Sequence, residues 1–251
     1  WLALADVLRT TAAPTADVSV ALKQAAKVAP NETRPRVLLV DHYLGQKDSK
    51  AALAAAQDAA AALPDVAEVL AALGRAQAAA GETHQALATF NKLANVMPAS
   101  PLPYLLMAQM QLSAKDNKAA LHSLNKAVEI KADFLPAQRA LVELAVASQQ
   151  KDQALALSKS VQKQRPTQTV GYTLEGDVQA VFKQWDAAAQ SYRASLKLAA
   201  SPDVAIRLYS VLNSAGKSAD ADRWVAEWNQ AHPKDVAAVS YTHLRAHETS
   251  L

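Results

Sequence analysis

The feature that most constrains this chain is a repeat of 34 residues. Alanine recurs at this interval at Ala52, Ala86, Ala120, Ala154 and Ala188. Proline keeps the same interval at Pro30, Pro64 and Pro98. A period of roughly 20 to 50 residues is typical of solenoids and other repeat arrays, in which each repeat packs only on its neighbours. The markers Ala221 and Pro233 each come one residue early, which predicts a single deletion near Pro202.

The composition favours closely packed helices. Apolar residues make up 51% of the 251 residues, whereas aromatic residues make up 5% and glycine occurs 6 times, a mixture typical of helices rather than sheets. The net charge of +3 includes no polybasic block, which argues against a nucleic-acid partner. No uncharged apolar run reaches the length of about 18 residues that a bilayer span needs. The absence of cysteine rules out disulfides and thiolate metal sites. The sequence therefore predicts an all-α fold.

Apolar residues at helical spacing predict helices in pairs. Two segments, Gly81–Thr83 and Gly216–Ser218, supply a left-handed turn residue and a capping residue between paired helices. The predicted pairs are 34–46 with 50–62, 68–80 with 84–97, 102–114 with 118–131, 136–148 with 152–164, 170–182 with 186–199, and 203–215 with 219–231. A partial unit precedes them, with helices over 1–9 and 16–28 and a linker through Pro14 between them.

The unit Ala67–Ser100 shows the repeat pattern best. Its characteristic residues are Leu70, Leu73, Gly74, Gly81, Ala86, Phe90, Ala94 and Pro98. Gly74 recurs three periods later as Gly176, and Phe90 recurs as Tyr192. A small residue lets paired helices approach, a large apolar residue fills the gap to the next pair, and proline stops the second helix. In this pattern the chain resembles the tetratricopeptide (TPR) family, which implies a right-handed α-solenoid of TPR helix-turn-helix repeats.

The register predicts how the chain is organised. We expect a partial N-terminal repeat and linker over 1–32, followed by six TPR-like repeats over 33–238. These repeats span about 33–66, 67–100, 101–134, 135–168, 169–201 and 202–234. The segment 239–251 has no repeat position and resembles a translated sequencing adaptor, so we expect it to be non-native. We also expect that the natural N-terminus precedes Trp1 and that further repeats follow Ala238.

No constellation of residues predicts catalysis. His243, His247 and Glu248 have metal-ligand spacing, but they fall in the adaptor-like tail. The other histidines are isolated, and the sequence contains neither a nucleophile elbow nor a phosphate-binding loop. We therefore expect no enzyme activity, no cofactor and no metal. Trp224 and Trp228 are expected to pack in the core, and the basic cluster of Lys159, Lys163 and Arg165 is expected to be a solvated face.

The TPR resemblance places partner binding on the concave face that the first helices form. The register assigns to this groove Arg34, Val37, Asp41, Glu68, Arg75, Leu102, Leu105, Gln109, Leu112, Arg139, Glu143, Val146, Thr173, Asp177, Ile206 and Asn213. Opposite charges mixed with aliphatic residues suit an extended peptide or a helix of a protein partner. Leu105 and Leu112 are expected to face the ligand rather than the core. The Lys and Asn pattern by which chaperone-binding TPR domains clamp a terminal carboxylate is absent.

Several strings resemble one subfamily. They are Leu73–Gln77, Gln85–Leu93, Gly171–Asp177 and Ser201–Leu208. They are similar to the TPR-repeat lipoprotein of bacterial PEP-CTERM/exosortase systems, the PrsT type. This resemblance implies a periplasmic or outer-membrane-associated scaffold, lipid-anchored through a missing N-terminal cysteine, that serves exopolysaccharide production or surface-protein sorting. Two alternatives are a cytoplasmic TPR adaptor and the TPR segment of a larger enzyme such as a glycosyltransferase.

Overall fold

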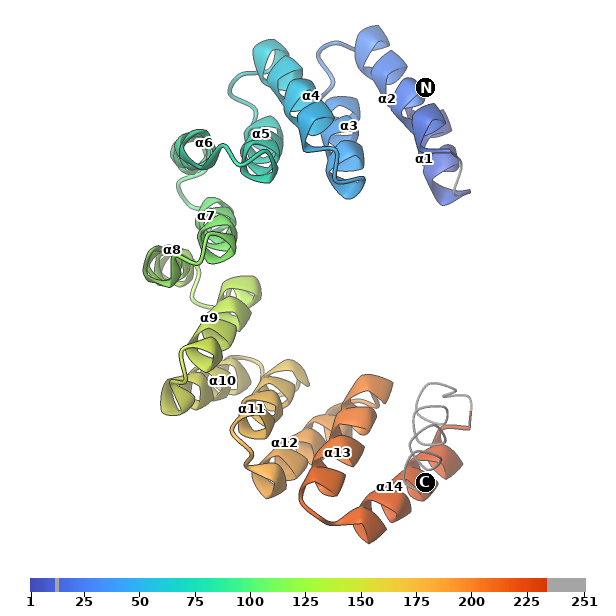
Figure 1. The fold of residues 1–251 in the computed structure, drawn as a ribbon, viewed down its shortest axis with the longest axis vertical. Coiled ribbons are helices and arrows are strands. Elements are labelled where there is room, and N and C mark those ends of the chain that lie inside the picture. The colour runs from blue at the N-terminus through green and yellow to red at the C-terminus, as the bar shows by residue number, and fades with distance from the viewer. Residues whose placement is uncertain (12–13, 234–251) are drawn as a thin grey trace. The chain divides into compact units, whose positions relative to one another are not determined.

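The computed structural model describes residues 1–11 and 14–233 of the chain. These residues form fourteen α-helices and no strand, so the predicted all-α fold is confirmed (Figure 1). The helices are α1 Leu2–Thr10, α2 Thr15–Val28, α3 Thr33–Gly45, α4 Ser49–Ala62, α5 Ala67–Ala79, α6 Thr83–Val96, α7 Leu102–Ser113, α8 Asn117–Ile130, α9 Leu135–Ala147, α10 Lys151–Gln164, α11 Val170–Val181, α12 Trp185–Leu198, α13 Pro202–Ser214 and α14 Ser218–Ala231. Each begins and ends within one residue of its predicted bound.

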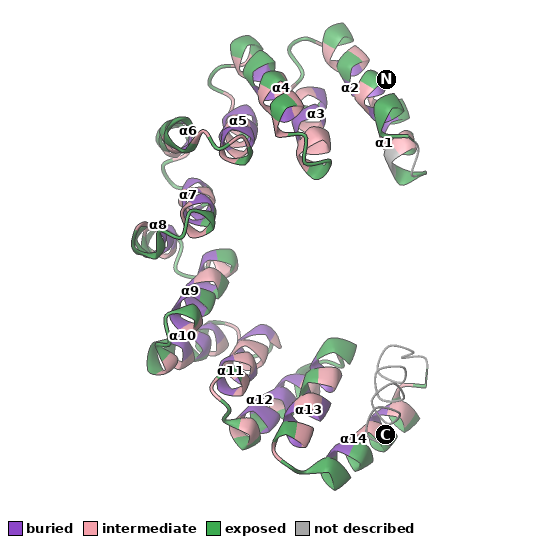
Figure 2. Cartoon of the chain, viewed as in Figure 1, coloured by how far each residue is buried: buried purple, intermediate pink, exposed green. Residues whose placement is uncertain are grey.

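The chain divides into two compact units. The first, Trp1–Ala132, contains α1 to α8, and the second, Asp133–Leu251, contains α9 to α14. Within each unit, the helices that pack together are either consecutive in the sequence or the first helices of successive hairpins, such as α3 with α5. This pattern is that of a solenoid, because each layer contacts only the next one. In Figure 2 the buried residues gather on α5 and α7, which lie between other helices, whereas α6 and α8 are largely exposed. The handedness and the division into six repeats stay predictions.

One backbone feature repeats at the turn of each of the six hairpins from α3 to α14. The residue with positive φ is Lys47, Gly81, Lys115, Gln149, Lys183 or Gly216, in chain order. These positions keep the 34-residue interval until the last, which is 33. The sequence signalled a left-handed residue only where glycine occurs. The connection between α12 and α13 is the shortest of those that join successive hairpins, with residues 199–201 only, which confirms the predicted deletion near Pro202.

The repeated alanines lie where the two helices of each hairpin meet. All five of the predicted series are 0% exposed, as is Ala221. Two glycines mark a still closer approach, because a Cβ atom at Gly74 would lie 2.3 Å from Cε1 of Phe90 and one at Gly176 would lie 2.5 Å from Cε1 of Tyr192. The small and the large residue that recur in the repeat pattern therefore pack against each other in both hairpins, as predicted.

A buried polar pair links the two helices in three of the hairpins. The hydroxyl of Thr89 donates to the Gln77 amide oxygen at 2.7 Å, and the hydroxyl of Ser191 donates to that of Gln179 at 2.8 Å. Gln111 and Ser123 are hydrogen-bonded at 2.8 Å in the equivalent place. Because buried polar groups are costly without partners, these pairs specify which helix faces which.

The predicted basic face is corrected at one residue. Lys159 and Lys163 are exposed, but the Arg165 side chain is only 14% exposed. Its guanidinium donates to the Gln138 side chain at 3.1 Å and to the Asp133 carbonyl oxygen. Arg165 follows the end of α10, so it reaches the start of α9 and fastens this hairpin instead of facing solvent.

Candidate functional site

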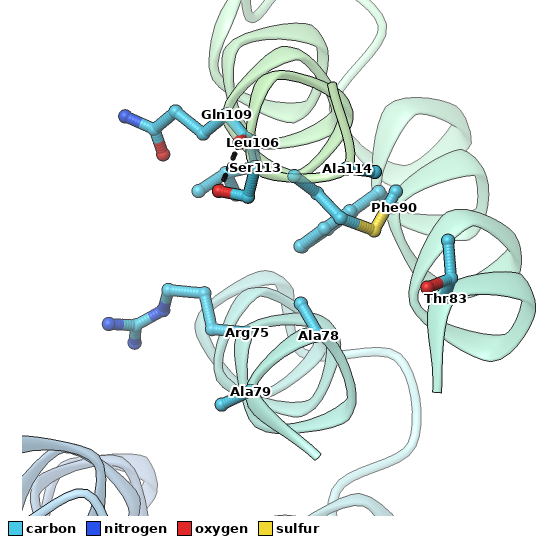
Figure 3. Close-up of a pocket in the computed structure, with 10 residues that line it drawn as sticks. Arg75, Ala78, Ala79, Thr83, Phe90, Leu106, Gln109, Ser113 and Ala114 are labelled. Carbon is cyan, nitrogen blue, oxygen red and sulfur yellow. Dashed lines mark hydrogen bonds between the residues drawn. The ribbon is translucent and has the colours of Figure 1, made fainter. Parts of the chain in front are cut away.

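An open pocket of about 420 Å³ lies between α5 and α7 in the first unit, with α6 behind it (Figure 3). Its lining residues are Arg75, Ala78, Ala79, Thr83, Phe90, Leu106, Gln109, Met110, Ser113 and Ala114. In Figure 3 the side chains of Arg75 and Gln109 point to the same side of the pocket, and Thr83 lies on the opposite side. The pocket thus separates the first helices of two successive hairpins, and two of the predicted groove residues stand at its rim.

A short side chain on α5 contributes to the pocket. Ala78 occupies the position that Leu44, Leu112 and Val146 occupy in α3, α7 and α9, and α11 also has a short residue there, Ala180. Phe90 cannot move into the space because its ring lies against Gly74 and is 1% exposed. Since the walls are held by core packing, the pocket is formed before any partner arrives, as ligand sites commonly are.

The rim of the pocket carries an ion pair. Arg75 Nη2 lies 2.8 Å from Asp41 Oδ1, which joins α5 to α3. The two side chains are 39% and 41% exposed, and an ion pair this exposed contributes about 0–1 kcal/mol. Gln109 is exposed on α7 and offers an amide that can both donate and accept. The site therefore combines an apolar interior with groups that can bind a carboxylate or a peptide backbone.

The other predicted groove residues of the first unit differ from one another in exposure and in contacts. Arg34 pairs with Asp6 at 3.1 Å, and Val37 packs against the cluster around Val40. Glu68 and Leu102 are exposed, and Leu112 is half-buried. Leu105 is buried, with 8% of its surface exposed, so the expectation that it faces a ligand is wrong. It lies on the side of α7 that packs inward, next to the buried Ala108 one turn later.

The predicted residues of the second unit are divided between exposed positions and internal contacts. Arg139 and Glu143 are exposed on α9, and Val146 packs against the Val142 cluster. The Thr173 hydroxyl lies 3.0 Å from that of Ser195.

Two predicted groove residues near the end of the second unit also make internal contacts. Asn213 Nδ2 donates to the Tyr209 carbonyl oxygen at 3.2 Å, and Ile206 packs against Ala205 and Trp228. These residues stabilise the hairpins, so the face predicted here is less available than in the first unit.

Asp177 is the best-connected of the predicted residues. It accepts a hydrogen bond from the Tyr192 hydroxyl at 2.8 Å and pairs with the Arg207 guanidinium, and so links α11, α12 and α13. Burial raises the pKa of the Tyr192 phenol, and the Asp177 carboxylate raises it further. The hydrogen bond to Asp177 raises the pKa of Arg207 above its usual value. The network holds hairpins together at ordinary pH.

Sequence reasoning missed most of the pocket lining. Thr83, Phe90, Leu106, Met110 and Ser113 line the pocket but were not assigned to the groove. The sequence carried only a partial signal, an alanine at a position that is Leu44, Leu112 or Val146 in three other first helices but again an alanine, Ala180, in α11. Among residues 1–11 and 14–233 no group of three or more potential metal ligands occurs, and His243, His247 and Glu248 lie outside these ranges. Within the same ranges, none of the helices is both apolar and long enough to traverse a bilayer.

Comparisons with known proteins identify the fold through structure alone. No family model matches the sequence, and no curated protein matches it. The structure resembles a tetratricopeptide repeat protein from Parabacteroides merdae ATCC 43184, with a TM-score of 0.59, 13% identity and 94% of each chain covered.

Two further solved structures agree. TTC0263, a thermophilic TPR protein of Thermus thermophilus, matches with a TM-score of 0.50 and 23% identity over 71% of this chain and 98% of its own. The APC/C hetero-tetramer Cut9–Hcn1 matches with a TM-score of 0.56 and 14% identity over 90% of this chain. The present chain spans 45% of that relative. The helical hairpins, their period and these similarities together give the chain the fold of a TPR repeat protein.

Proposed function

We propose that this chain is a non-catalytic scaffold that binds a protein partner, and that the α5–α7 pocket holds a side chain of that partner. The observation that carries the proposal is the preformed apolar pocket between successive first helices, with Arg75 and Gln109 at its rim. Extended peptides bind grooves by placing side chains in pockets while polar groups meet the backbone. The TPR fold of the structural relatives supports the same class of function.

The groups around the pocket define the peptide that fits. Leu106, Met110 and Phe90 offer an apolar interior for one aliphatic or aromatic side chain. Gln109 can bind the peptide backbone, and Arg75 can bind a neighbouring carboxylate. Because the Arg75 side chain is 39% exposed, a carboxylate of the partner can reach its guanidinium beside Asp41. An extended segment with a large apolar residue next to an acidic one satisfies all these groups.

The cellular setting is also a proposal. The resemblance of Leu73–Gln77, Gln85–Leu93, Gly171–Asp177 and Ser201–Leu208 supports a scaffold in exopolysaccharide-linked PEP-CTERM/exosortase protein sorting, periplasmic or associated with the outer membrane. The alternatives are a cytoplasmic adaptor and the TPR segment of a glycosyltransferase or another enzyme. The full-length gene separates the three, because a lipobox signal supports the first, a plain Met start the second and a downstream catalytic domain the third.

Site-specific photocrosslinking tests the pocket. A benzophenone amino acid at Gln109 should crosslink a partner from an envelope fraction, and the partner should be absent when the same group replaces Ala88, which is exposed on α6 outside the pocket. Ala78→Leu should fill the pocket and lower the crosslinking yield at least about tenfold, while Ala88→Leu provides the matched control. If Ala78→Leu keeps both its helicity and its crosslinking yield, the partner does not enter this pocket.

A further inference from the structure

A second open pocket, of about 400 Å³, lies between α12 and α14 in the second unit. These are the second helices of successive hairpins, so the pocket is built from different helices than the groove of first helices. One wall belongs to α12 and carries Arg193, Leu196 and Lys197. The other wall belongs to α14 and includes Trp224 and Trp228. The two walls differ in chemistry.

The wall on α14 is aromatic and fixed. Trp224 and Trp228 are tilted against each other with ring centroids 5.7 Å apart, and Trp228 stacks on His232 at 4.0 Å. Trp228 is 6% exposed, as expected of a core residue, whereas Trp224 is only half-buried and its indole N–H donates to the Ala205 carbonyl oxygen at 3.4 Å. The repeat positions equivalent to these two carry only Ala, Thr, Ser, Leu or Val in the earlier hairpins. The aromatic wall is therefore peculiar to this hairpin.

The wall on α12 is cationic. Arg193 and Lys197 are one helical turn apart and exposed. Within the described part of the chain neither forms an ion pair. Glu227, on α14, is the one carboxylate among the described lining residues. Since two cations flank the pocket against one anion, the pocket favours an anionic ligand.

We propose that the α12–α14 pocket is a second binding site, for an acidic peptide segment that inserts one aromatic or aliphatic side chain. The apolar side chain would lie on Trp224 beside Leu196, since aromatic rings contribute contact area and favourable ring geometry. Carboxylates next to it would meet Arg193 and Lys197. A mainly apolar interior favours a peptide over a carbohydrate, whose hydroxyl groups need a ring of polar partners. The α5–α7 pocket and this pocket share no residue, so the two proposed sites can be tested independently.

Isothermal titration calorimetry of the full chain tests this site with defined peptides. The probe is the acetylated and amidated hexapeptide Glu-Asp-Phe-Leu-Asp-Glu, with Lys-Lys-Phe-Leu-Lys-Lys and Glu-Asp-Gly-Gly-Asp-Glu as controls. Binding with a Kd below about 1 mM is expected for the first peptide alone. The double variant Arg193→Glu, Lys197→Glu should weaken it at least about tenfold, since like charges then face the carboxylates.

The preceding repeat supplies a matched control. Lys159 and Lys163 occupy the equivalent positions of α10, one period earlier, without an aromatic wall opposite. Lys159→Glu with Lys163→Glu should leave peptide affinity within about twofold. Because the probe peptide also has the apolar and acidic residues that suit the α5–α7 pocket, the titrations are made in the Ala78→Leu variant, so that the binding measured belongs to the α12–α14 pocket.

Four binding results would overturn the proposal. They are no binding of the acidic peptide up to about 1 mM, equal binding of the basic peptide, equal loss in the Lys159 and Lys163 variant, and binding of an oligogalacturonate in place of the peptide. A heat of dilution that reveals self-association through this face would also overturn it, because the occupant would then be a second copy of the chain.

Discussion

Replacing Gly74 by alanine should destabilise the second hairpin although it adds a better helix former. An alanine Cβ would lie 2.3 Å from Cε1 of Phe90 and 2.7 Å from its Cδ1. Phe90 packs in a cluster with Leu70 and Leu93, so moving its ring away from the new Cβ would break these contacts. Forcing extra atoms into such a core costs about 1–3 kcal/mol, and exchanging glycine for alanine in a helix gains about 0.5–1 kcal/mol. The net loss is expected to be about 1–2 kcal/mol.

Two further variants separate the clash from the helix propensity. Gly45 also lies in a helix, at the end of α3, but nothing is within 4 Å of a Cβ placed there. Gly45→Ala should therefore stabilise the chain by up to about 1 kcal/mol. In a Phe90→Leu background, Gly74→Ala should become neutral or stabilising, because the ring atoms that it meets are gone. The coupling between the two sites should reach about 1 kcal/mol or more.

Urea unfolding followed by far-UV circular dichroism measures these differences. The midpoint should fall for Gly74→Ala, rise for Gly45→Ala, and show the coupling in the double variant. If Gly74→Ala stabilises the chain as much as Gly45→Ala does, the ring of Phe90 is not held against this glycine, and the argument for a rigid α5–α7 pocket fails as well.

Three other perturbations follow from the fold. Ala120→Glu should cost several kcal/mol, about 3–5, by burying an unpaired charge at a position that is 0% exposed, and a thermal melt equal to that of the parent would contradict the register. Lys115→Gly should stabilise the chain by about 1 kcal/mol in urea unfolding, because Lys115 holds a φ of 61° that glycine adopts without strain, whereas Gly81→Ala should destabilise it by a similar amount. Because the pKa of Tyr192 is raised in the folded chain, its stabilising contribution is complete below the unfolded-state pKa of about 10 and falls as pH rises above that value. Tyr192→Phe removes the hydrogen bond to Asp177 and should therefore lower the stability at neutral pH. In a series of melts at increasing pH, the same variant should lose less stability at alkaline pH than the parent does.

The helices could be predicted from the sequence because each repeat carries its own boundary marks. Proline, alanine and glycine recur at fixed positions, so an error in one repeat is corrected by the others. The left-handed turn residues show what a residue-type rule misses. Gly81 and Gly216 indicated such turns, but Lys47, Lys115 and Gln149 adopt the same conformation. Backbone geometry at this point is imposed by the packing of the hairpin, and the period, not the residue type, is the signal that predicts it.

The candidate site was harder to predict than the fold. The repeat register assigned Arg75 and Gln109 to the groove from helical periodicity, and the structure places both in the lining of one pocket. It did not give the pocket between them, since a pocket depends on how far two hairpins stand apart and on which side chain fills the space. Leu105 was assigned to the groove although only 8% of it is exposed, because the register alone does not give how deeply neighbouring helices bury a side chain. The α12–α14 pocket was missed because core packing was preferred to ligand binding as the interpretation of Trp224.

The glutamine and hydroxyl pairs bear on how nearly identical repeats avoid exchanging partners during folding. A first helix could dock on the second helix of another hairpin, since their apolar faces are alike. Gln179 finds Ser191 in its own hairpin, but the residue equivalent to Ser191 in the preceding hairpin is Leu157. Docking α11 on α10 in the hairpin arrangement would bury the Gln179 amide against Leu157, at a penalty of about 1–3 kcal/mol for the unsatisfied group. The Gln179–Ser191 pair therefore distinguishes the α11–α12 hairpin from the α9–α10 hairpin before it, so an exchange of partners between these two is penalised before the stack can grow on it.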